Sequence, residues 1–507
     1  TDNLKIDELK DYLNRFKVRI VLTAHPTQFY PGSVLGIIND LAKAISVGEL
    51  ESVKMLLTQL GKTKFYKKIK PTPFDEAISL IWYLENVFYH SASTIYTYIK
   101  RNIFNKNELD NAIFDFGFWP GGDRDGNPYV TPEITIKTAE SLKFSILRNY
   151  FREVRKMKRS LTFDGLEEKL DSLENDLYAT LFSKNKPLYF NITYFENALN
   201  EIHEIIKNQS NGLYESLILD LKHKVKIFGF HFASLDIRQD SRIHKQVFDE
   251  IFSHPRIRDY VEGLPDNFSE LNVELRHQVL TSIKGDVPVD IFESTITKET
   301  LGSIRAMRQI QERNGERGCN RYIISNCQTI DNLLELFALH KICDWDKPSV
   351  DIIPLFETIP DLEVCEEIMN LLYNNEAYRK HLTSRGDKQT VMLGFSDGTK
   401  DGGYFMANWS IYKAKEDLTG LSKKYGINIA FFDGRGGPPA RGGGNTHEFY
   451  ASMGNKIQAD DIQLTIQGQT ISSNFGTNDS CQYNLEQLLS SGIHNQVFNS
   501  ERNILSD

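Results

Sequence analysis

Residues 351–358 read D-I-I-P-L-F-E-T, and this short stretch indicates the fold. Branched and aromatic side chains predominate up to Phe356, which predicts a buried strand. The polar pair Glu357-Thr358 marks the end of that strand. Apolar residues at helical spacing follow over residues 362–373, so the sequence predicts a strand, a polar loop and then a helix.

Seven other stretches repeat this pattern. Short β-branched or apolar runs occupy residues 18–24, 112–119, 225–235, 322–327, 390–395, 428–432 and 462–466. Each run ends in a polar, charged or Gly-rich cluster, and a helical segment follows most of them. Strand, polar loop and helix, repeated eight times, predicts an α/β fold, a (β/α)8 barrel of the TIM type. We interpret residues 1–507 as one barrel domain with large, predominantly α-helical insertions, the longest between the second and third strands.

The composition argues against several classes of protein. The 507 residues include 59 Lys and Arg against 68 Asp and Glu, a net charge of −9, which disfavours a nucleic-acid-binding role. No apolar run is long enough to cross a bilayer, and residues 1–14 are too polar for a signal peptide. Five cysteines without a C-x-x-C pair indicate free thiols in a reducing compartment. We therefore expect a cytoplasmic protein with no nucleic-acid or membrane partner.

Arginines accumulate at the predicted strand ends and in the loops after them. They are Arg124, Arg238, Arg435 and Arg441. The planar guanidinium group fits phosphate and carboxylate oxygens, so four of them at one barrel mouth predict a small polyanionic substrate. Asp123 and Asp125 flank Arg124, however, and we interpret Arg124 as a member of a structural ion pair with them.

The last two arginines lie in the Gly-rich segment G-R-G-G-P-P-A-R-G-G-G at residues 434–444. Glycines such as Gly436 and Gly437 let the backbone approach a ligand closely. Arginines within such a loop favour a cradle for phosphate or carboxylate over a plain turn.

Two carboxylates follow separate predicted strands. Glu357 comes after residues 352–356, and Asp397 comes after residues 392–395. Oxygen ligands of this kind suit Mg²⁺ or Mn²⁺, and with two protein ligands the ion keeps positions open for water and substrate. The alternative is that each carboxylate pairs with an arginine.

His25 and Lys400 are candidates for proton transfer. His25 lies in a rigid turn between Ala24 and Pro26, where a general acid or base is as reasonable as a capping or packing role. Lys400 lies three residues after Asp397 and is either its charge partner or a proton donor.

Six ordered motifs resemble phosphoenolpyruvate carboxylase of the bacterial and plant type. They are T-A-H-P-T (23–27), G-G-D-R-D-G-N-P (121–128), L-D-I-R-Q (235–239), P-L-F-E-T (354–358), S-D-x-x-K-D (396–401) and G-R-G-G-x-x-x-R-G-G-G (434–444). The resemblance implies a biotin-independent carboxylase. Bicarbonate attacks the phosphate of phosphoenolpyruvate to give carboxyphosphate and an enolate, and the enolate then traps carbon dioxide to form oxaloacetate.

The same resemblance implies roles for individual residues. It implies that Glu357 and Asp397 bind the metal ion and that Arg238 and Arg435 bind substrate oxygens. It also implies catalytic roles for His25, Lys400 and Arg441, and Arg441 would in addition sense inhibitory dicarboxylates. Asp433 stands where the family's loop has a His that handles the carboxyl donor, so Asp433 is a further catalytic candidate and a departure from the pattern.

The resemblance also implies partners and length. The expected substrates are phosphoenolpyruvate and bicarbonate, and the expected assembly is a homotetramer. Family members extend beyond both ends of this chain, so we expect their C-terminal part, with a mobile substrate loop and most of the aspartate-inhibition site, to be absent here. The alternatives are a catalytically silent scaffold or sensor, and a metal-dependent barrel lyase that acts on another phosphorylated enol.

Overall fold

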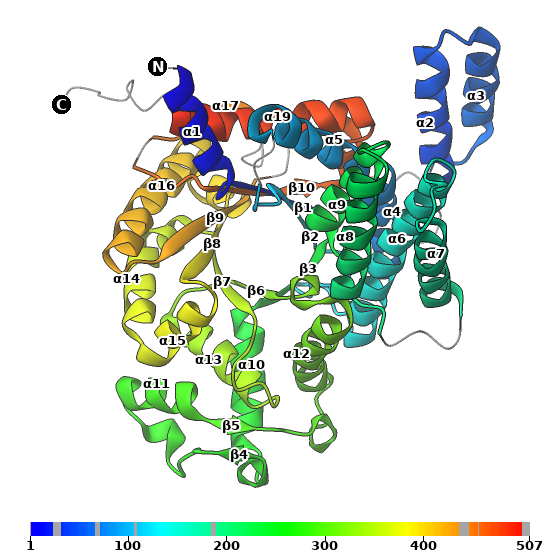
Figure 1. The fold of residues 1–507 in the computed structure, drawn as a ribbon. Helices are drawn as coiled ribbons and strands as arrows, with labels where there is room; N and C mark the ends of the chain where they lie inside the picture. Colours follow the sequence, from blue (N-terminus) through cyan, green and yellow to red (C-terminus); the bar gives the residue numbers. More distant parts are fainter. Residues whose placement is uncertain are drawn as a thin grey trace.

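A closed barrel of parallel strands forms the centre of the molecule (Figure 1). The computed structural model describes residues 2–23, 32–65, 71–105, 109–183, 189–435, 446–454 and 456–498. The strands are β1 (Lys17–Thr23), β2 (Phe114–Phe118), β3 (Ser234–Asp240), β6 (Arg321–Ser325), β7 (Asp351–Phe356), β8 (Lys388–Gly394), β9 (Asn428–Gly434) and β10 (Asp461–Gln467). They pair in the order β1-β10-β9-β8-β7-β6-β3-β2. The predicted TIM-type barrel is confirmed.

Helices surround the barrel. Those that follow a strand in the described part of the chain include α10 (Ser241–Ser253), α13 (Ile330–Lys341), α14 (Ile359–Asn374), α16 (Ser396–Lys424) and α18 (Gly468–Asn474). α14 begins at a capping box in which the Thr358 hydroxyl accepts from the Asp361 N–H, while the Asp361 carboxylate accepts from the Thr358 N–H. Such a cap satisfies two backbone donors that a helix start leaves open. This cap fixes the start of the helix directly after Glu357.

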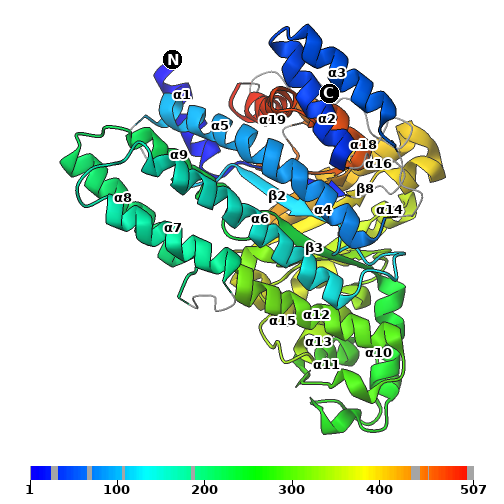
Figure 2. The same ribbon diagram turned by 90° about the vertical axis from the view of Figure 1, so that its right-hand side faces the viewer.

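Other helices form the insertions. They are α2 (Gly32–Ser46), α3 (Leu50–Lys62), α4 (Pro73–Tyr83) and α5 (Tyr89–Ile99) before β2; α6 (Pro132–Lys158), α7 (Glu167–Phe182), α8 (Ile192–Gln209) and α9 (Glu215–Phe228) before β3; and α11 (Val273–Ser282) and α12 (Thr295–Asn314) before β6. The short strands β4 (Val261–Glu262) and β5 (Lys284–Gly285) pair beside α11. α15 (Glu376–Ser384), α17 (Thr446–Ala451) and α19 (Asn478–Ile493) complete the shell, with α1 (Asp2–Leu13) before β1. The α2–α3 hairpin projects from the body, and α6 to α9 lie along one side (Figures 1 and 2).

The third strand was predicted wrongly at residues 225–235. Residues 225–228 are the last turn of α9, and β3 begins at Ser234. Ile218, Leu221 and Val225 are buried at helical spacing, so the apolar run belongs to the inner face of a helix. Gly229, with φ of 51°, ends the helix. The D-I-R-Q-D cluster consequently forms the strand itself and does not follow it.

Strand residues alternate between the barrel interior and the surrounding helices, as the two-residue period of a strand requires. Val21, Ile323, Ile353, Met392 and Phe432 belong to a separate buried cluster that fills the interior. Their strand neighbours belong to the larger core between strands and helices. This alternation decides which strand-end side chains reach the mouth.

Charged groups fill the end of the barrel where the strands begin. The Arg19 guanidinium is 2.9 Å from Asp236 and also pairs with Asp115, while Arg321 donates to the Gln463 amide oxygen at 2.9 Å. Arg19, Asp236 and Arg321 are buried. Buried charges are tolerated only when paired in this way, so the network closes one end of the barrel and leaves the other end open.

All five cysteines are free, as predicted, and the structure shows that all five are buried. In the described part of the chain, no helix combines the length and apolar character needed to cross a bilayer.

Candidate active site

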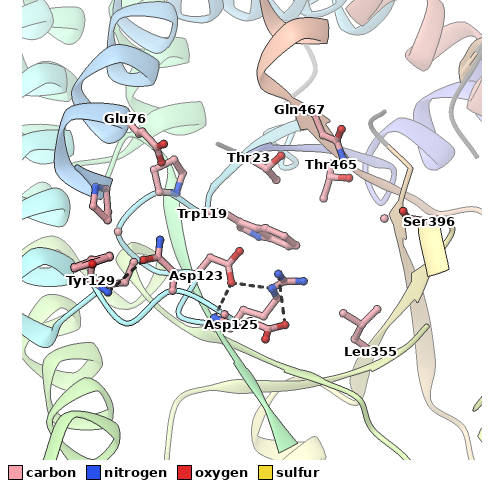
Figure 3. A pocket seen from close by; sticks show the side chains of 18 of the residues that line it. Thr23, Glu76, Trp119, Asp123, Asp125, Tyr129, Leu355, Ser396, Thr465 and Gln467 are labelled. Carbon is pink, nitrogen blue, oxygen red and sulfur yellow. Dashed lines mark hydrogen bonds and ion pairs between the residues drawn. The ribbon is translucent and has the colours of Figure 1, made fainter. Parts of the chain in front are cut away.

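A cavity of about 920 Å³ opens where the strands end (Figure 3). Residues from β1, β3, β7, β8, β9 and β10 line it, together with the loop after β2 and the first turn of α16. TIM barrels carry their reactive groups at this end. Arg238, Glu357 and Asp397, which were predicted from three separate motifs, all line this one cavity.

Arg238 is held by residues of the loop after β2. Its Nε donates to the Asp123 carboxylate at 2.8 Å, and its Nη2 is 3.5 Å from the Asp125 carboxylate. The guanidinium carbon lies 4.7 Å from the centre of the Trp119 ring. Burial acts to lower the pKa of Arg238, but Asp123, Asp125 and Glu357 together raise the pKa above its ordinary value. Arg238 is therefore a fixed cation in the cavity wall.

Glu357 continues β7 into the cavity. Its Oε2 accepts the Asn326 N–H at 3.1 Å, from a loop after β6 in which Asn326 has a φ of 52°. Burial raises the pKa of the Glu357 carboxyl to about 7, Asn326 and Arg238 oppose the rise, and Asp397 and Asp125 add to it. The rise in the Glu357 pKa thus comes mainly from burial, and the neighbouring carboxylates make a smaller contribution.

A glycine leaves room for this carboxylate. A Cβ on Gly394 of β8 would lie 3.1 Å from the Cα of Glu357. Any larger side chain would press on the backbone that positions Glu357, so the small residue permits the close approach.

Asp397 enters the cavity from the first turn of α16, where a negative side chain suits the helix dipole. Its carboxylate pairs with Lys400 at 2.6 Å, one turn further along. The alternative of a pairing with arginine is wrong for Asp397, and Lys400 is its charge partner, one of the two roles considered for that lysine.

The donor set suits a hard divalent cation. Glu357 and Asp397 extend from β7 and β8, which are neighbours in the barrel, and both offer carboxylate oxygens. A cation between them would stabilise the ionised Glu357 carboxylate, whose pKa is raised mainly by burial and further by the Asp397 charge. Within the described residues no group of three or more His, Cys, Asp and Glu side chains is arranged around one point. Mg²⁺ or Mn²⁺ with open positions fits this arrangement better than an enclosed Zn²⁺ site.

Asp433 points away from the cavity. Its neighbour Phe432 packs in the barrel interior, so Asp433 faces the helices outside. Its carboxylate lies 2.7 Å from the buried Lys415 of α16 and accepts the Tyr450 hydroxyl at 2.8 Å. The structure therefore does not bring Asp433 together with Arg238, Glu357 and Asp397.

Two other arginines lie away from the cavity lining. Arg124 is buried and donates to the Glu299 backbone oxygen at 2.7 Å and the Ser303 hydroxyl at 2.9 Å. Its structural role is as expected, but the expected pairing with Asp123 and Asp125 is wrong. Arg435 is buried with its guanidinium carbon 3.7 Å from the centre of the Phe449 ring. The predicted residues His25, Gly436, Gly437 and Arg441 lie outside the described residues.

Sequence reasoning missed four residues of this site, three of which contribute side chains and one a backbone N–H. They are Trp119, Asp123, Asp125 and Asn326. Residues 120–122 form a turn in which the Gly122 and Asp123 N–H groups donate to the Trp119 carbonyl, so no strand period relates Trp119 to the two carboxylates. Only the two-residue spacing of Asp123 and Asp125 indicates that these two side chains face the same way. No local pattern indicates the contribution of Asn326, because its N–H meets Glu357 through the pairing of β6 with β7.

Comparison with known proteins identifies similar sequences. A family model described as phosphoenolpyruvate carboxylase matches residues 1–186 and 165–504. The phosphoenolpyruvate carboxylase of Nitrosomonas eutropha is 30% identical over 570 aligned residues, which cover 98% of this chain and 60% of the relative. That of Nitrosomonas europaea is 29% identical, with 98% and 59% covered. The chain thus spans about 60% of the length of these curated relatives.

Proposed function

Since the chain belongs to the phosphoenolpyruvate carboxylase family, we propose that it converts phosphoenolpyruvate and bicarbonate to oxaloacetate and phosphate. The observation that carries the proposal is the convergence of Arg238, Glu357 and Asp397 on one cavity at the strand ends. A phosphorylated enol needs cationic groups for its phosphate and carboxylate oxygens, and this cavity offers both a fixed guanidinium group and a carboxylate pair suited to a cation.

The proposed reaction has two stages. A bicarbonate oxygen attacks the phosphorus, the bond from phosphorus to the enol oxygen breaks, and carboxyphosphate and the pyruvate enolate form. Carboxyphosphate then releases carbon dioxide and phosphate, and the enolate carbon bonds to the carbon dioxide. Mg²⁺ or Mn²⁺, held by Glu357 and Asp397, would supply the positive charge that stabilises phosphate and enolate oxygens.

The residues of this chain bind and protect the reactants. Arg238 would bind the phosphate or carboxylate group, since its Nη1 makes no hydrogen bond with any described residue. Trp119, Leu355 and Met392 add apolar surface to the cavity wall. Apolar walls limit the access of water, which would otherwise protonate the enolate to pyruvate. His25 and Lys400 remain the candidates for proton transfer, from their motifs.

We assign no chemical step to Asp433, because its carboxylate is engaged outside the barrel with Lys415 and Tyr450. Arg435 and Arg441 remain candidates for substrate binding, from the Gly-rich loop motif. The homotetramer implied by the resemblance also stays a prediction, which light scattering tests.

The test is oxaloacetate formation. The protein is incubated with phosphoenolpyruvate, bicarbonate and Mn²⁺, and oxaloacetate is followed through NADH oxidation by malate dehydrogenase. Calorimetry measures phosphoenolpyruvate binding in parallel. We expect both signals, and we expect Arg238→Lys, which keeps the charge but loses the planar fork, to weaken both.

The other outcomes distinguish the alternatives. Binding without oxaloacetate formation would favour the scaffold or sensor. Consumption of another phosphorylated enol, with no oxaloacetate from phosphoenolpyruvate, would favour the lyase. Absence of both binding and turnover would contradict the proposed function itself.

A further inference from the structure

The loop after β2 is joined to β3 beside Arg238. The Arg124 N–H donates to the Arg238 carbonyl at 2.9 Å, and the Arg238 N–H donates to the Gly122 carbonyl at 3.2 Å. A Cβ on Gly122 would lie 2.2 Å from the Asp236 carbonyl oxygen, so only glycine allows this approach. The loop therefore prolongs the barrel wall at the cavity, with its backbone in fixed register with Arg238.

Side chains in this extended segment alternate between two sides. Asp123 and Asp125 face Arg238 inside the cavity, as Figure 3 shows. Arg124 between them points the opposite way, to the Glu299 backbone oxygen and the Ser303 hydroxyl of α12. The D-R-D sequence thus provides two carboxylates on one side and one buried anchor on the other.

The anchored loop restrains the guanidinium group from three directions. Asp123 accepts from Nε, Asp125 lies beside Nη2, and the Trp119 ring covers one face. These partners are themselves held in place. Asp125 accepts a hydrogen bond from the Ser325 hydroxyl at 2.7 Å, and the indole N–H of Trp119 donates to the buried Asp236 carboxylate at 3.2 Å. Nη2 has the ion pair with Asp125 but no hydrogen bond, and Nη1 has neither a hydrogen bond nor an ion pair with a described residue.

Two carboxylates around one guanidinium group give the cluster a net negative charge. Asp123 and Asp125 therefore do not increase the attraction of the site for an anion. They restrain the Arg238 side chain, and an arginine that is already oriented loses less rotamer freedom when it binds a ligand.

We propose that Asp123 and Asp125 are positioning residues that direct Nη1 of Arg238 toward the anionic substrate, and that Arg124 anchors the loop that carries them. The proposal rests on the proposed function for the identity of that substrate. The cluster acts through Arg238, and neither carboxylate contacts the reacting atoms.

Whether Asp125→Asn weakens or tightens substrate binding distinguishes an orienting role for Asp125 from an effect of its charge alone. Asp125→Asn removes a negative charge beside an anionic ligand, so tighter binding is expected if net charge alone matters. If orientation matters, binding weakens. We expect the dissociation constant of phosphoenolpyruvate in the presence of Mn²⁺, measured by calorimetry, to rise about tenfold or more in Asp125→Asn and in Asp123→Asn.

Asp351→Asn is the matched control. Asp351 is the first residue of β7 and pairs with Arg385 at 2.8 Å, so its loss removes an ion pair of the same barrel at the end where the strands begin. We expect lower stability but an unchanged dissociation constant. Unchanged or tighter binding in Asp125→Asn would overturn the proposal, as would a control that weakens binding equally.

A ligand-free readout keeps this test separate from the proposed function. Crystal structures of native protein and of the Asp123→Asn and Asp125→Asn variants show whether the Arg238 guanidinium group moves off Trp119. Displacement in either variant supports the proposal even if the native protein binds no phosphoenolpyruvate, in which case only the proposed function fails. An unmoved guanidinium group in both variants overturns the positioning role. Trp119→Leu provides a second test should either variant not fold, with displacement again expected.

Discussion

Glu357 and Asp397 are the two side chains on which the proposed metal site depends. Both line the cavity and offer carboxylate oxygens, although the described residues contain no group of three or more metal-binding side chains around one point. Glu357→Gln and Asp397→Asn should each weaken Mn²⁺ binding at least about tenfold, since even groups behind a metal ligand contribute that much to affinity. Electron paramagnetic resonance of free Mn²⁺ measures this directly. Full Mn²⁺ affinity in the double variant would show that these are not the ligands.

The control for this prediction is a carboxylate of the surface. Glu376→Gln breaks an exposed pair with Lys380 on α15 and should leave Mn²⁺ affinity unchanged. A general loss of negative charge would affect both kinds of variant, whereas loss of a ligand affects only the first.

His25 is another single residue with a predicted role in the reaction, and it lies outside the described residues. From its motif we expect it to matter more for carboxylation of the enolate than for cleavage of the phosphate ester. His25→Asn should therefore release phosphate and pyruvate with little oxaloacetate, measured by parallel assays of the three products. Loss of all three together would point to a binding or structural role.

At the scale of elements, one buried ion pair joins α16, β9 and α17. Lys415 lies 2.7 Å from Asp433, and both side chains are almost completely buried. Lys415→Met leaves an uncompensated carboxylate in this apolar surrounding, which should cost about 3–5 kcal/mol of unfolding free energy. Chemical denaturation measures the loss.

The double variant Lys415→Met with Asp433→Asn tests the cause. It removes both charges and keeps an acceptor for the Tyr450 hydroxyl, so it should recover most of the stability. It should also keep phosphoenolpyruvate affinity, because Asp433 faces away from the cavity. If Asp433→Asn instead stops oxaloacetate formation at native stability, Asp433 takes part in the chemistry.

At the scale of the whole molecule, buried histidines make stability depend on pH. Burial lowers the pKa of His231 and His244 to about 3, and of His340 and His381 to about 4. The unfolded chain titrates near 6.5, so below that pH it binds more protons than the folded protein does. Stability should therefore be lost as pH falls from about 6.5 toward 4, by about 1.4 kcal/mol per pH unit for each such histidine.

The measurement is the denaturant midpoint across this pH window. His244→Gln removes one titrating group and should flatten the slope, whatever its effect on stability at pH 7. An unaltered slope in His244→Gln would contradict the assignment.

Local sequence determined the barrel, because strand period and polar strand ends are properties of adjacent residues. Seven of the predicted strands lie close to their observed positions, and β7 matches residue for residue. The third predicted strand is wrong because the apolar run that includes Val225 and Phe228 is compatible both with a buried strand and with the buried face of a helix. Only the packing of α9 decides between the two. Motifs likewise predict that Arg238, Glu357 and Asp397 belong to one site, and all three line the same cavity.

Tertiary structure decided which partner each charged side chain has. Neighbours in sequence suggested Asp123 and Asp125 for Arg124, but alternation along the extended loop sends Arg124 to α12 and gives both carboxylates to Arg238. The partner of Asp433 was likewise decided by packing, because Asp433 pairs with Lys415, which is buried on a helix outside the barrel. An ion pair depends on which side chains meet across packed elements. Asp123 and Arg238 are 115 residues apart and Lys415 and Asp433 are 18 apart, and at neither separation does a local pattern record the meeting.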